Sequence, residues 1–301
     1  MGFYLYKLLW SRFGVMIKHL GKLLLTFGNL HDMIKAIVFP RRRFFMKSFS
    51  FTIDDNIRFL KEITESGAKS LFDHPYTAML RRLHEKFNLK IQLNMFYSTN
   101  GFDLSMMSDR YAKEWEECSD WLKMSFHARG AIQRLYENSG YDEVYRDCRQ
   151  VNEEILRISS PLSLAKTTTI HFCATNDEGV KALADNGVKG LLGLFGSDAR
   201  PRVSYNVEES IAKKLRRGAI ETDRGVAFAD IDLVANAVEQ EEIVPLLSKR
   251  LSNETIRVMI HEQYFYFDYE RYQPNFEEKL SIAFDLLCKN GYQSQFFEEM
   301  L

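Results

Sequence analysis

Two adjacent carboxylates end a short apolar segment, FSFTIDDN, at residues 49–56. The segment has the aromatic and β-branched residues typical of a strand, and adjacent side chains of a strand point to opposite sides. Asp54 and Asp55 therefore do not form an obvious paired-acid site. Their divergence suits two separate tasks: one acid binds a metal ion, and the other accepts a proton from a water that the metal activates.

Three of the seven histidines also fall in or at the ends of apolar segments. His127 follows LKMSF, His171 lies in TTTIHF, and His261 follows IRVMI. Any one of these histidines alone is more typical of a structural residue than of a ligand. Taken together with a carboxylate from another segment, imidazoles from separate strands are the usual ligands of a catalytic divalent-metal site. The sequence therefore suggests one shared metal site.

Strand-like segments alternate with helix-like segments through residues 46–301. This alternation predicts an α/β fold with a parallel sheet or a β/α barrel, in which functional residues gather at the carboxyl ends of the strands. After the segment that ends in the two acids, strands are predicted at 89–97, 122–128, 167–174, 188–195, 225–231 and 255–262, with a further short strand at 292–297. Helices are predicted at 74–88, 108–121, 141–159, 177–187 and 275–291, and residues 57–68 form a connecting segment or short helix.

The composition is that of a globular protein, with 46% hydrophobic and 27% charged residues. A formal net charge of −1 argues against nucleic acid as a partner. The four cysteines are far apart in the sequence and form no CxxC pair. They are predicted to be reduced thiols rather than parts of a zinc ribbon or a disulfide framework.

Residues 1–45 form a basic and apolar extension, which we expect to be helical and peripheral to a domain at 46–301. Nine basic residues against the single acid Asp32 give residues 1–47 a charge of +8, which leaves −9 for the rest. Charges interrupt every apolar run, so neither a transmembrane helix nor a secretory signal is predicted. The extension is either an amphipathic helix for a membrane surface or partner, or a segment without an essential role. We expect a cytoplasmic protein, peripheral to the membrane under the first interpretation.

Three short motifs resemble those of the polysaccharide deacetylases, a family of metal-dependent carbohydrate esterases. FTIDDN (51–56) is similar to the family's strand ending in T-F-D-D-G. SFHARG (125–130) is similar to its histidine motif, and VMIHEQ (258–263) to its late Leu/Ile-x-His-Asp motif. The motifs occur in the family's order, and the resemblance spans residues 48–297.

The resemblance implies a distorted β/α barrel that binds a divalent metal, with Zn²⁺ as the expected ion. By position, Asp54 becomes the catalytic base, Asp55 and His127 become metal ligands, and His261 becomes the acid that protonates the leaving group. The implied reaction is hydrolysis of an N- or O-acyl group, such as acetyl, from a carbohydrate or a related amide.

The sequence also departs from the family pattern. The family's second histidine ligand, four residues after the first, is replaced by Ala131, and its Arg-x-Pro-Tyr motif is missing. We hypothesise that His171 replaces the lost ligand. Asn56 stands in place of the usual glycine, and Glu262 in place of the usual acid after the late histidine. These changes describe a divergent member in which either the metal site is rebuilt or the activity is altered or lost.

Four further residues are candidates for contact with a carbohydrate. Aromatic side chains stack on sugar rings, and charged ones bind acidic sugars or an oxyanion; the candidates are Trp121, Arg129, Glu262 and Tyr264. The alternatives are that the aromatic residues pack as a lid or rim and that Arg129 forms a surface salt bridge. Two other functions also remain open: an inactive carbohydrate-binding or scaffold protein, and a membrane-associated partner in glycan assembly. The oligomeric state is not determined by the sequence.

Overall fold

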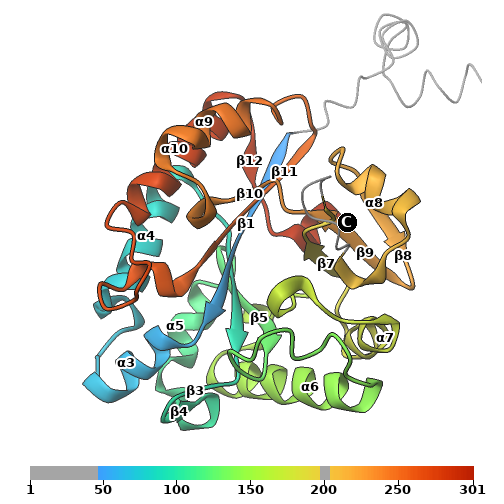
Figure 1. The fold of residues 1–301 in the computed structure, drawn as a ribbon. Helices are drawn as coiled ribbons and strands as arrows, with labels where there is room; N and C mark the ends of the chain where they lie inside the picture. Colours follow the sequence, from blue (N-terminus) through green and yellow to red (C-terminus); the bar gives the residue numbers. More distant parts are fainter. Residues whose placement is uncertain (1–46, 197–203) are drawn as a thin grey trace, which may run out of the picture. The chain divides into compact units, whose positions relative to one another are not determined.

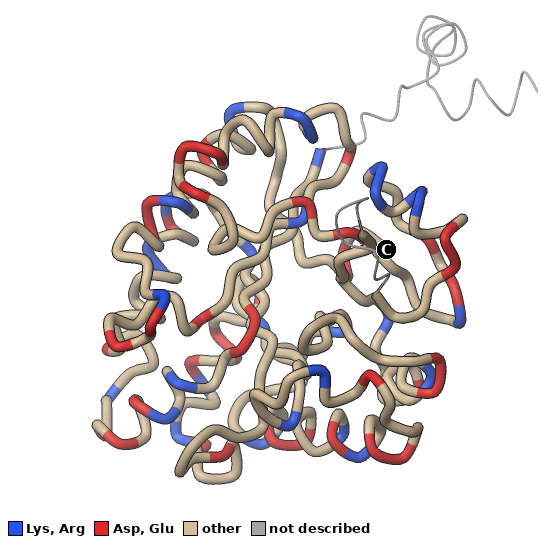
Figure 2. The backbone as a smooth tube through the Cα atoms, in the orientation of Figure 1, with Lys and Arg blue, Asp and Glu red and all other residues tan. Residues whose placement is uncertain are grey.

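The structure is a computed structural model that describes residues 47–196 and 204–301 (Figure 1). The extension predicted at 1–45 lies outside the described residues. None of the described helices is both long enough and apolar enough to cross a membrane. Acidic and basic residues are mixed along the described chain (Figure 2).

The first sheet is entirely parallel, so the carboxyl ends of its strands lie at one edge. Its strand order is β10-β11-β1-β2-β5, and β12 pairs with the start of β1. Along the chain the strands are β1 (Ser48–Asn56), β2 (Ile91–Phe96), β5 (Leu122–Ala128), β10 (Leu233–Val234), β11 (Thr255–His261) and β12 (Gln293–Ser294). The central position of β1 gives it β2 on one side and β11 on the other.

The second sheet has the order β6-β7-β9-β8, with β8 as an antiparallel edge strand. Its strands are β6 (Thr167–Thr168), β7 (Gly190–Gly193), β8 (Ile220–Asp223) and β9 (Val226–Asp230). An isolated parallel bridge between Met124 and Leu164 joins β5 to the approach to β6, and the chain passes from β9 directly into β10. The strands of these two sheets thus follow one another around a ring. Within the described residues, hydrogen bonding does not close this ring, so the strands form two separate sheets.

Helices lie around the outside of the strands (Figure 1). Those described are α3 (Arg58–Ser66), α4 (Pro75–Phe87), α5 (Ala112–Glu117), α6 (Tyr141–Ile158), α7 (Asp177–Asp185), α8 (Glu209–Leu215), α9 (Gln240–Ser248) and α10 (Phe276–Lys289). A short antiparallel hairpin, β3 (Ser98–Thr99) and β4 (Phe102–Asp103), follows β2. Pro75 at the first position of α4 and His74, whose Nδ1 accepts from the backbone N–H of Tyr76, start that helix as expected.

The residues of β1 alternate between two buried environments. Phe49 and Phe51 pack against Phe284 of α10, with ring centroids 5.6 and 4.9 Å apart. The residues between and beyond them, including Thr52 and Asp54, are also buried but polar. β2 and β5 repeat this pattern with Gln92, Asn94, Ser125 and His127. The core on the helix side is therefore apolar, whereas the face turned into the ring is polar and leads toward the carboxyl ends of the strands.

Most predicted elements are present, and one prediction that matters for the site is wrong. The strand predicted at 167–174 is reduced to Thr167–Thr168, and His171–Cys173 forms a 3₁₀ turn. Phe172 and Cys173 have left-handed backbones, with φ of 61° and 51°, which a strand does not allow. The elements α8, α9 and β8 were not predicted, and the helix predicted at 108–121 is shortened to α5 after a 3₁₀ turn. All four cysteines are free, as expected.

A buried arginine lies where the two sheets meet. Arg257 on β11 is fully buried, and its Nε donates to the backbone carbonyl of Asp230 at 2.7 Å. The same Nε lies 3.2 Å from a carboxylate oxygen of Asp232. Asp232 also accepts from the backbone N–H of Arg257 at 2.9 Å. These contacts tie β11 to the segment that links β9 with β10.

Candidate metal centre

β1 ends in an irregularity that redirects its last side chains. Its pairing with β2 shifts register between Ile53 and Asn56, which indicates a β-bulge. Asp55 has φ of 63°, a left-handed conformation that is uncommon outside glycine and occurs among aspartates. Asp54 and Asp55 therefore do not simply point to opposite sides, and the carboxylates of both interact with His127.

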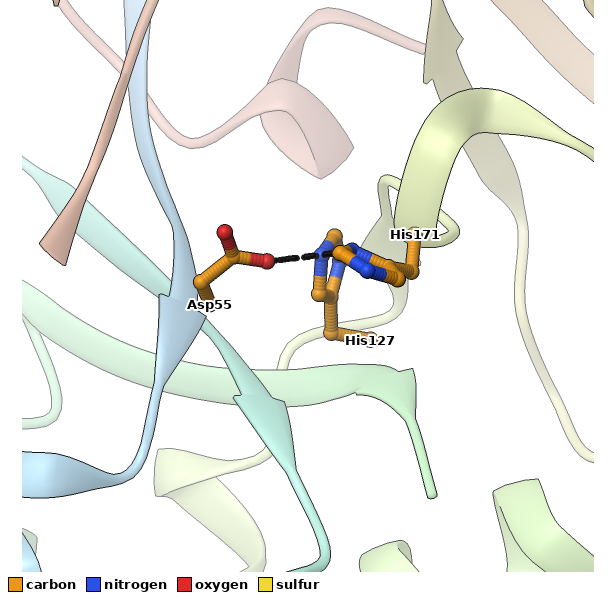
Figure 3. A group of neighbouring side chains, drawn as sticks. All are labelled: Asp55, His127 and His171. Carbon is orange, nitrogen blue, oxygen red and sulfur yellow. Dashed lines mark hydrogen bonds and ion pairs between the residues drawn. The ribbon is translucent and has the colours of Figure 1, made fainter. Parts of the chain in front are cut away.

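Asp55, His127 and His171 converge on one point (Figure 3). Oδ1 of Asp55 lies 3.0 Å from Nε2 of His127 and 3.1 Å from Nδ1 of His171. The two imidazole nitrogens are 3.1 Å apart. The three side chains come from β1, β5 and the 3₁₀ turn after β6. The structure thus brings together the three residues proposed from the sequence as ligands.

The orientation of each imidazole has a local cause. Nδ1 of His127 lies 2.5 Å from the carbonyl oxygen of Thr169, to which it donates, so its Nε2 is left with a free lone pair in the neutral ring. His171 precedes the two left-handed residues of its turn, and its ring packs edge-on against Phe96 and Phe172. The turn that replaced the predicted strand is therefore what directs His171 toward His127.

Charge and burial act on these groups in opposite senses. Burial alone would raise the pKa of Asp55, but hydrogen bonds with His127 and His171 hold that pKa well below its usual range. Burial would lower the pKa of His127, and the negative charges of Asp54 and Asp55 outweigh it and raise that pKa. Burial lowers the pKa of His171. An ionised carboxylate and a neutral imidazole are the forms that bind metal ions.

The three donor atoms fit a divalent metal. A tetrahedral site with bonds of about 2.0–2.1 Å places neighbouring ligand atoms about 3.3 Å apart. The separations here are 3.0 to 3.1 Å, so the three side chains need to move apart by only a few tenths of an ångström. One carboxylate oxygen and two imidazole nitrogens are also a donor set that divalent metals take at catalytic sites, with a further position for water or substrate.

The predicted catalytic acid and base lie beside this triad on adjacent strands. Asp54 pairs in register with His261 across β1 and β11. Asp54 is buried and accepts a hydrogen bond from Nδ2 of Asn94 at 2.6 Å, and burial raises the pKa of its carboxyl. His261 is partly exposed, and its Nδ1 lies 2.9 Å from Oδ1 of Asn236. Because the amide oxygen accepts from Nδ1, Nε2 of His261 is the nitrogen left for a substrate.

Two of the predicted substrate residues have structural roles instead. Glu262 is buried, and its carboxylate accepts from the backbone N–H groups of Ile57, Arg58 and Phe59 at the start of α3. It anchors the amino end of that helix. Trp121 precedes β5, so it lies at the opposite end of that strand from His127, and its ring stacks on His84 with centroids 4.3 Å apart. A buried tryptophan at that end is part of the core.

The other two predicted substrate residues remain at the carboxyl end of the strands. Tyr264 is partly exposed, and its ring centroid is 6.1 Å from that of His261. Arg129 is exposed and follows β5 directly. Ala131, at the family's second histidine position, is exposed in the loop after β5.

Several residues of the site were missed at the sequence level. Asn94, Asn236 and Gln263 each hydrogen-bond to one of the predicted site residues. For Asn94 there was a signal, because Gln92 and Asn94 are two polar residues at alternate positions of an otherwise apolar strand. Asn236 and Gln263 lie in short turns after strands, where polar amides are ordinary and give no signal.

The comparisons with known proteins rest on structure alone. No protein-family model matches the sequence, and no curated protein matches it. A solved structure described as a "putative polysaccharide deacetylase" from Mycobacterium smegmatis matches with a TM-score of 0.52 and 9% sequence identity. The match covers 85% of this chain and 89% of that one.

A second solved structure with the same kind of fold is a larger enzyme. The 4-α-glucanotransferase from Thermococcus litoralis matches with a TM-score of 0.54 and 13% identity. The match covers 84% of this chain and only 39% of the glucanotransferase. At identities this low, the structural matches establish the fold alone, and the activity has to be argued from the site. The two sheets are parallel apart from the edge strand β8 and are surrounded by helices. Together with these matches, they show that the chain has the α/β fold of the polysaccharide deacetylases, as the three strand-end motifs implied.

Proposed function

We propose that this protein is a metal-dependent hydrolase that removes an N- or O-acyl group, such as acetyl, from a carbohydrate. The observation that carries the proposal is the convergence of Asp55, His127 and His171 at the carboxyl ends of the strands. Asp54 and His261 lie beside that triad in register on adjacent strands. A metal triad with a carboxylate and an imidazole next to it has the parts that acyl-group hydrolysis needs.

Each residue has a task in this reaction. A divalent metal at the triad, for which Zn²⁺ is the expected ion, would polarise the acyl carbonyl and lower the pKa of a water. Asp54 accepts the proton of the attacking water, and a carboxyl whose pKa is raised by burial is a better base for this than an exposed one. His261 donates the proton on its own Nε2 to the leaving amine or alcohol.

The proposed carbohydrate substrate is supported by the similar structures and by the residues beside the site. The similar structure from M. smegmatis is described as a polysaccharide deacetylase, whereas the similar structure from T. litoralis is a glucanotransferase. The fold therefore hosts more than one chemistry, and the triad favours the metal-dependent one. Tyr264 and Arg129, beside the site, supply a ring face and a charge for binding a sugar.

Acetate release is the test. We expect purified protein with Zn²⁺ to release acetate from an N-acetylated or an O-acetylated oligosaccharide. Asp54→Asn keeps the three ligands and should lower the rate by roughly 10²- to 10⁴-fold, the usual contribution of a general base. Protein that binds no metal stoichiometrically would contradict the proposal. Protein that binds metal and carbohydrate but releases no acetate would instead support the inactive carbohydrate-binding alternative.

A further inference from the structure

Each of the two acids at the end of β1 is held by one side-chain amide. Nδ2 of Asn94 donates to Oδ1 of Asp54 at 2.6 Å. Nε2 of Gln263 donates to Oδ2 of Asp55 at 2.7 Å. Asn94 belongs to β2 and Gln263 follows β11, and these strands are the two neighbours of β1. The adjacent acids are therefore held from opposite sides of their strand.

The orientation of the Asn94 side-chain amide is fixed by a network of buried hydrogen bonds between side chains on neighbouring strands. Oδ1 of Asn94 accepts from Nε2 of Gln92 at 2.8 Å and from Oγ of Ser125 at 2.5 Å. Gln92 is fixed in turn, because its Nε2 donates to the carbonyl of Thr167 and its Oε1 accepts from the Thr167 hydroxyl, both at 2.9 Å. With two donors on its oxygen, Asn94 must present its nitrogen to Asp54.

The hydrogen bond from Gln263 gives the two carboxylate oxygens of Asp55 different partners. An ionised carboxylate only accepts hydrogen bonds, so the glutamine nitrogen is the atom that faces it. Gln263 occupies Oδ2, and Oδ1 is the oxygen that lies 3.0 and 3.1 Å from the two imidazole nitrogens. One oxygen is thus left for a metal, and the carboxylate cannot rotate without breaking the Gln263 bond.

We infer that Asn94 and Gln263 are positioning residues that assign the two adjacent acids their separate tasks. Asn94 holds Asp54 as the proton acceptor, and Gln263 holds Asp55 as a ligand through a single oxygen. The inference rests on the proposed function, because it assumes that the triad binds a metal. It goes beyond that function by predicting that metal affinity and turnover respond to different amides.

Metal affinity is measured first, by competition between the protein and a chelator for Zn²⁺. Gln263→Met keeps the length of the side chain and removes the donor. Loss of a hydrogen bond to a ligand typically weakens metal affinity by about 10- to 100-fold, which is the expected result here. Asn94→Ala should keep affinity within about threefold. The matched control is Gln240→Ala, since Gln240 donates to the carboxylate of Glu278 at 3.0 Å between α9 and α10, and it should not change affinity.

Turnover and structure complete the test. Asn94→Ala should lower kcat by about 10- to 100-fold with little change in KM, and its crystal structure should show the Asp54 carboxylate displaced and Asp55 in place. Because Ala at this buried position removes an acceptor from Gln92 and Ser125, Asn94→Asp serves as the second variant, since it keeps that oxygen and loses the N–H donors. It should lower kcat without weakening metal affinity.

The outcomes separate the inference from the proposed function. Wild-type protein that binds no Zn²⁺ overturns both. If the wild type binds Zn²⁺ and the Gln263→Met affinity is unchanged, or Asn94→Ala weakens metal binding as strongly as Gln263→Met, the inference is overturned while the metal site stands. A wild type that binds Zn²⁺ without releasing acetate overturns the proposed reaction, and the metal titrations and the crystal structure of Asn94→Ala still decide the inference.

Discussion

Two pairs of carboxylates follow strands of this fold, and they have different partners. Asp54 and Asp55 end β1, where Asp55 contacts the imidazoles of His127 and His171. Asp230 ends β9, and Asp232 follows two residues later. Asp232 contacts the guanidinium of Arg257.

The difference lies in what the partners can do besides neutralise charge. An arginine is always protonated and has no lone pair to offer, so the Asp232 pair is a closed structural contact. A neutral imidazole has a lone pair, so the Asp55 group can release its protons and bind a cation. Buried carboxylates at strand ends are therefore insufficient to mark a functional site, and the type of residue beside them decides.

The largest effect should come from removing a ligand at the first pair. His171→Ala deletes one of three donors, and we expect Zn²⁺ affinity to fall by more than about 100-fold, beyond the effect of a residue that only orients a ligand. Acetate release should be lost with it. His84→Ala is the matched control, because His84 is partly buried on α4 and stacks on Trp121 away from the triad. Metal retained in His171→Ala would leave the ligand hypothesis for this residue wrong.

Removing Arg257, the partner of Asp232, should lower the free energy of unfolding without changing metal affinity. Arg257→Met removes the fully buried guanidinium from Asp232 and leaves that carboxylate only the partly exposed Arg250, whose Nε is 3.6 Å away. Breaking a buried ion pair typically costs about 3–5 kcal/mol in the free energy of unfolding. Urea unfolding measures the loss, and Zn²⁺ affinity of the folded fraction should stay at the wild-type value. A loss below about 1 kcal/mol would argue that the junction of the sheets does not depend on this arginine.

The pH dependence of stability isolates Asp230. Burial raises the pKa of this carboxyl to about 6. The folded state therefore binds its proton more tightly than the unfolded chain, and the free energy of unfolding falls as the pH rises from about 4 to about 6. Asp230→Asn keeps the oxygen that accepts from the backbone N–H of Phe195 and removes the titration.

The free energy of unfolding of Asp230→Asn, relative to that of the wild type, should therefore rise by up to about 3 kcal/mol between pH 4 and pH 7. Urea unfolding at the two pH values gives this difference directly. A difference between variant and wild type that is the same at both pH values would show that Asp230 titrates in its ordinary range.

The smallest effect on the free energy of unfolding is expected at an exposed ion pair. Arg82 contacts Glu277 through two nitrogens, at 3.1 and 2.6 Å, with both side chains largely in solvent. Arg82→Ala should change the free energy of unfolding by about 0.2–1 kcal/mol, the usual value for exposed pairs. A loss as large as that of Arg257→Met would remove burial as the reason for the difference between the pairs.

Much of the fold was predictable because its strands and helices have clear periodicity. β1, β5 and β11 contain apolar runs with acids or a histidine near their ends, β2 is largely apolar, and α4, α6 and α10 have apolar residues at helical spacing. The approach of Asp55 to His127 was also predictable, since β1 and β5 are parallel strands of one sheet and bring their carboxyl ends to one edge, whereas His171 reaches them from the turn after β6.

What was missed depends on tertiary context. The segment around His171 has β-branched residues typical of a strand, yet it turns in a left-handed conformation that no local pattern announces. Glu262 follows a catalytic candidate in the sequence, but its carboxylate accepts hydrogen bonds from the buried N–H groups of Ile57 and Phe59 at the start of α3. Trp121 precedes β5 rather than following it, so its distance from the site follows only from the strand direction.

The central claim is that Asp55, His127 and His171 bind a divalent metal. The most direct measurement is anomalous diffraction above the zinc absorption edge from crystals grown with equimolar Zn²⁺. We predict a single strong peak bonded to Oδ1 of Asp55, Nε2 of His127 and Nδ1 of His171 at about 2.0–2.2 Å. A structure with no peak at these atoms, or with the ion held by other residues, would contradict the account.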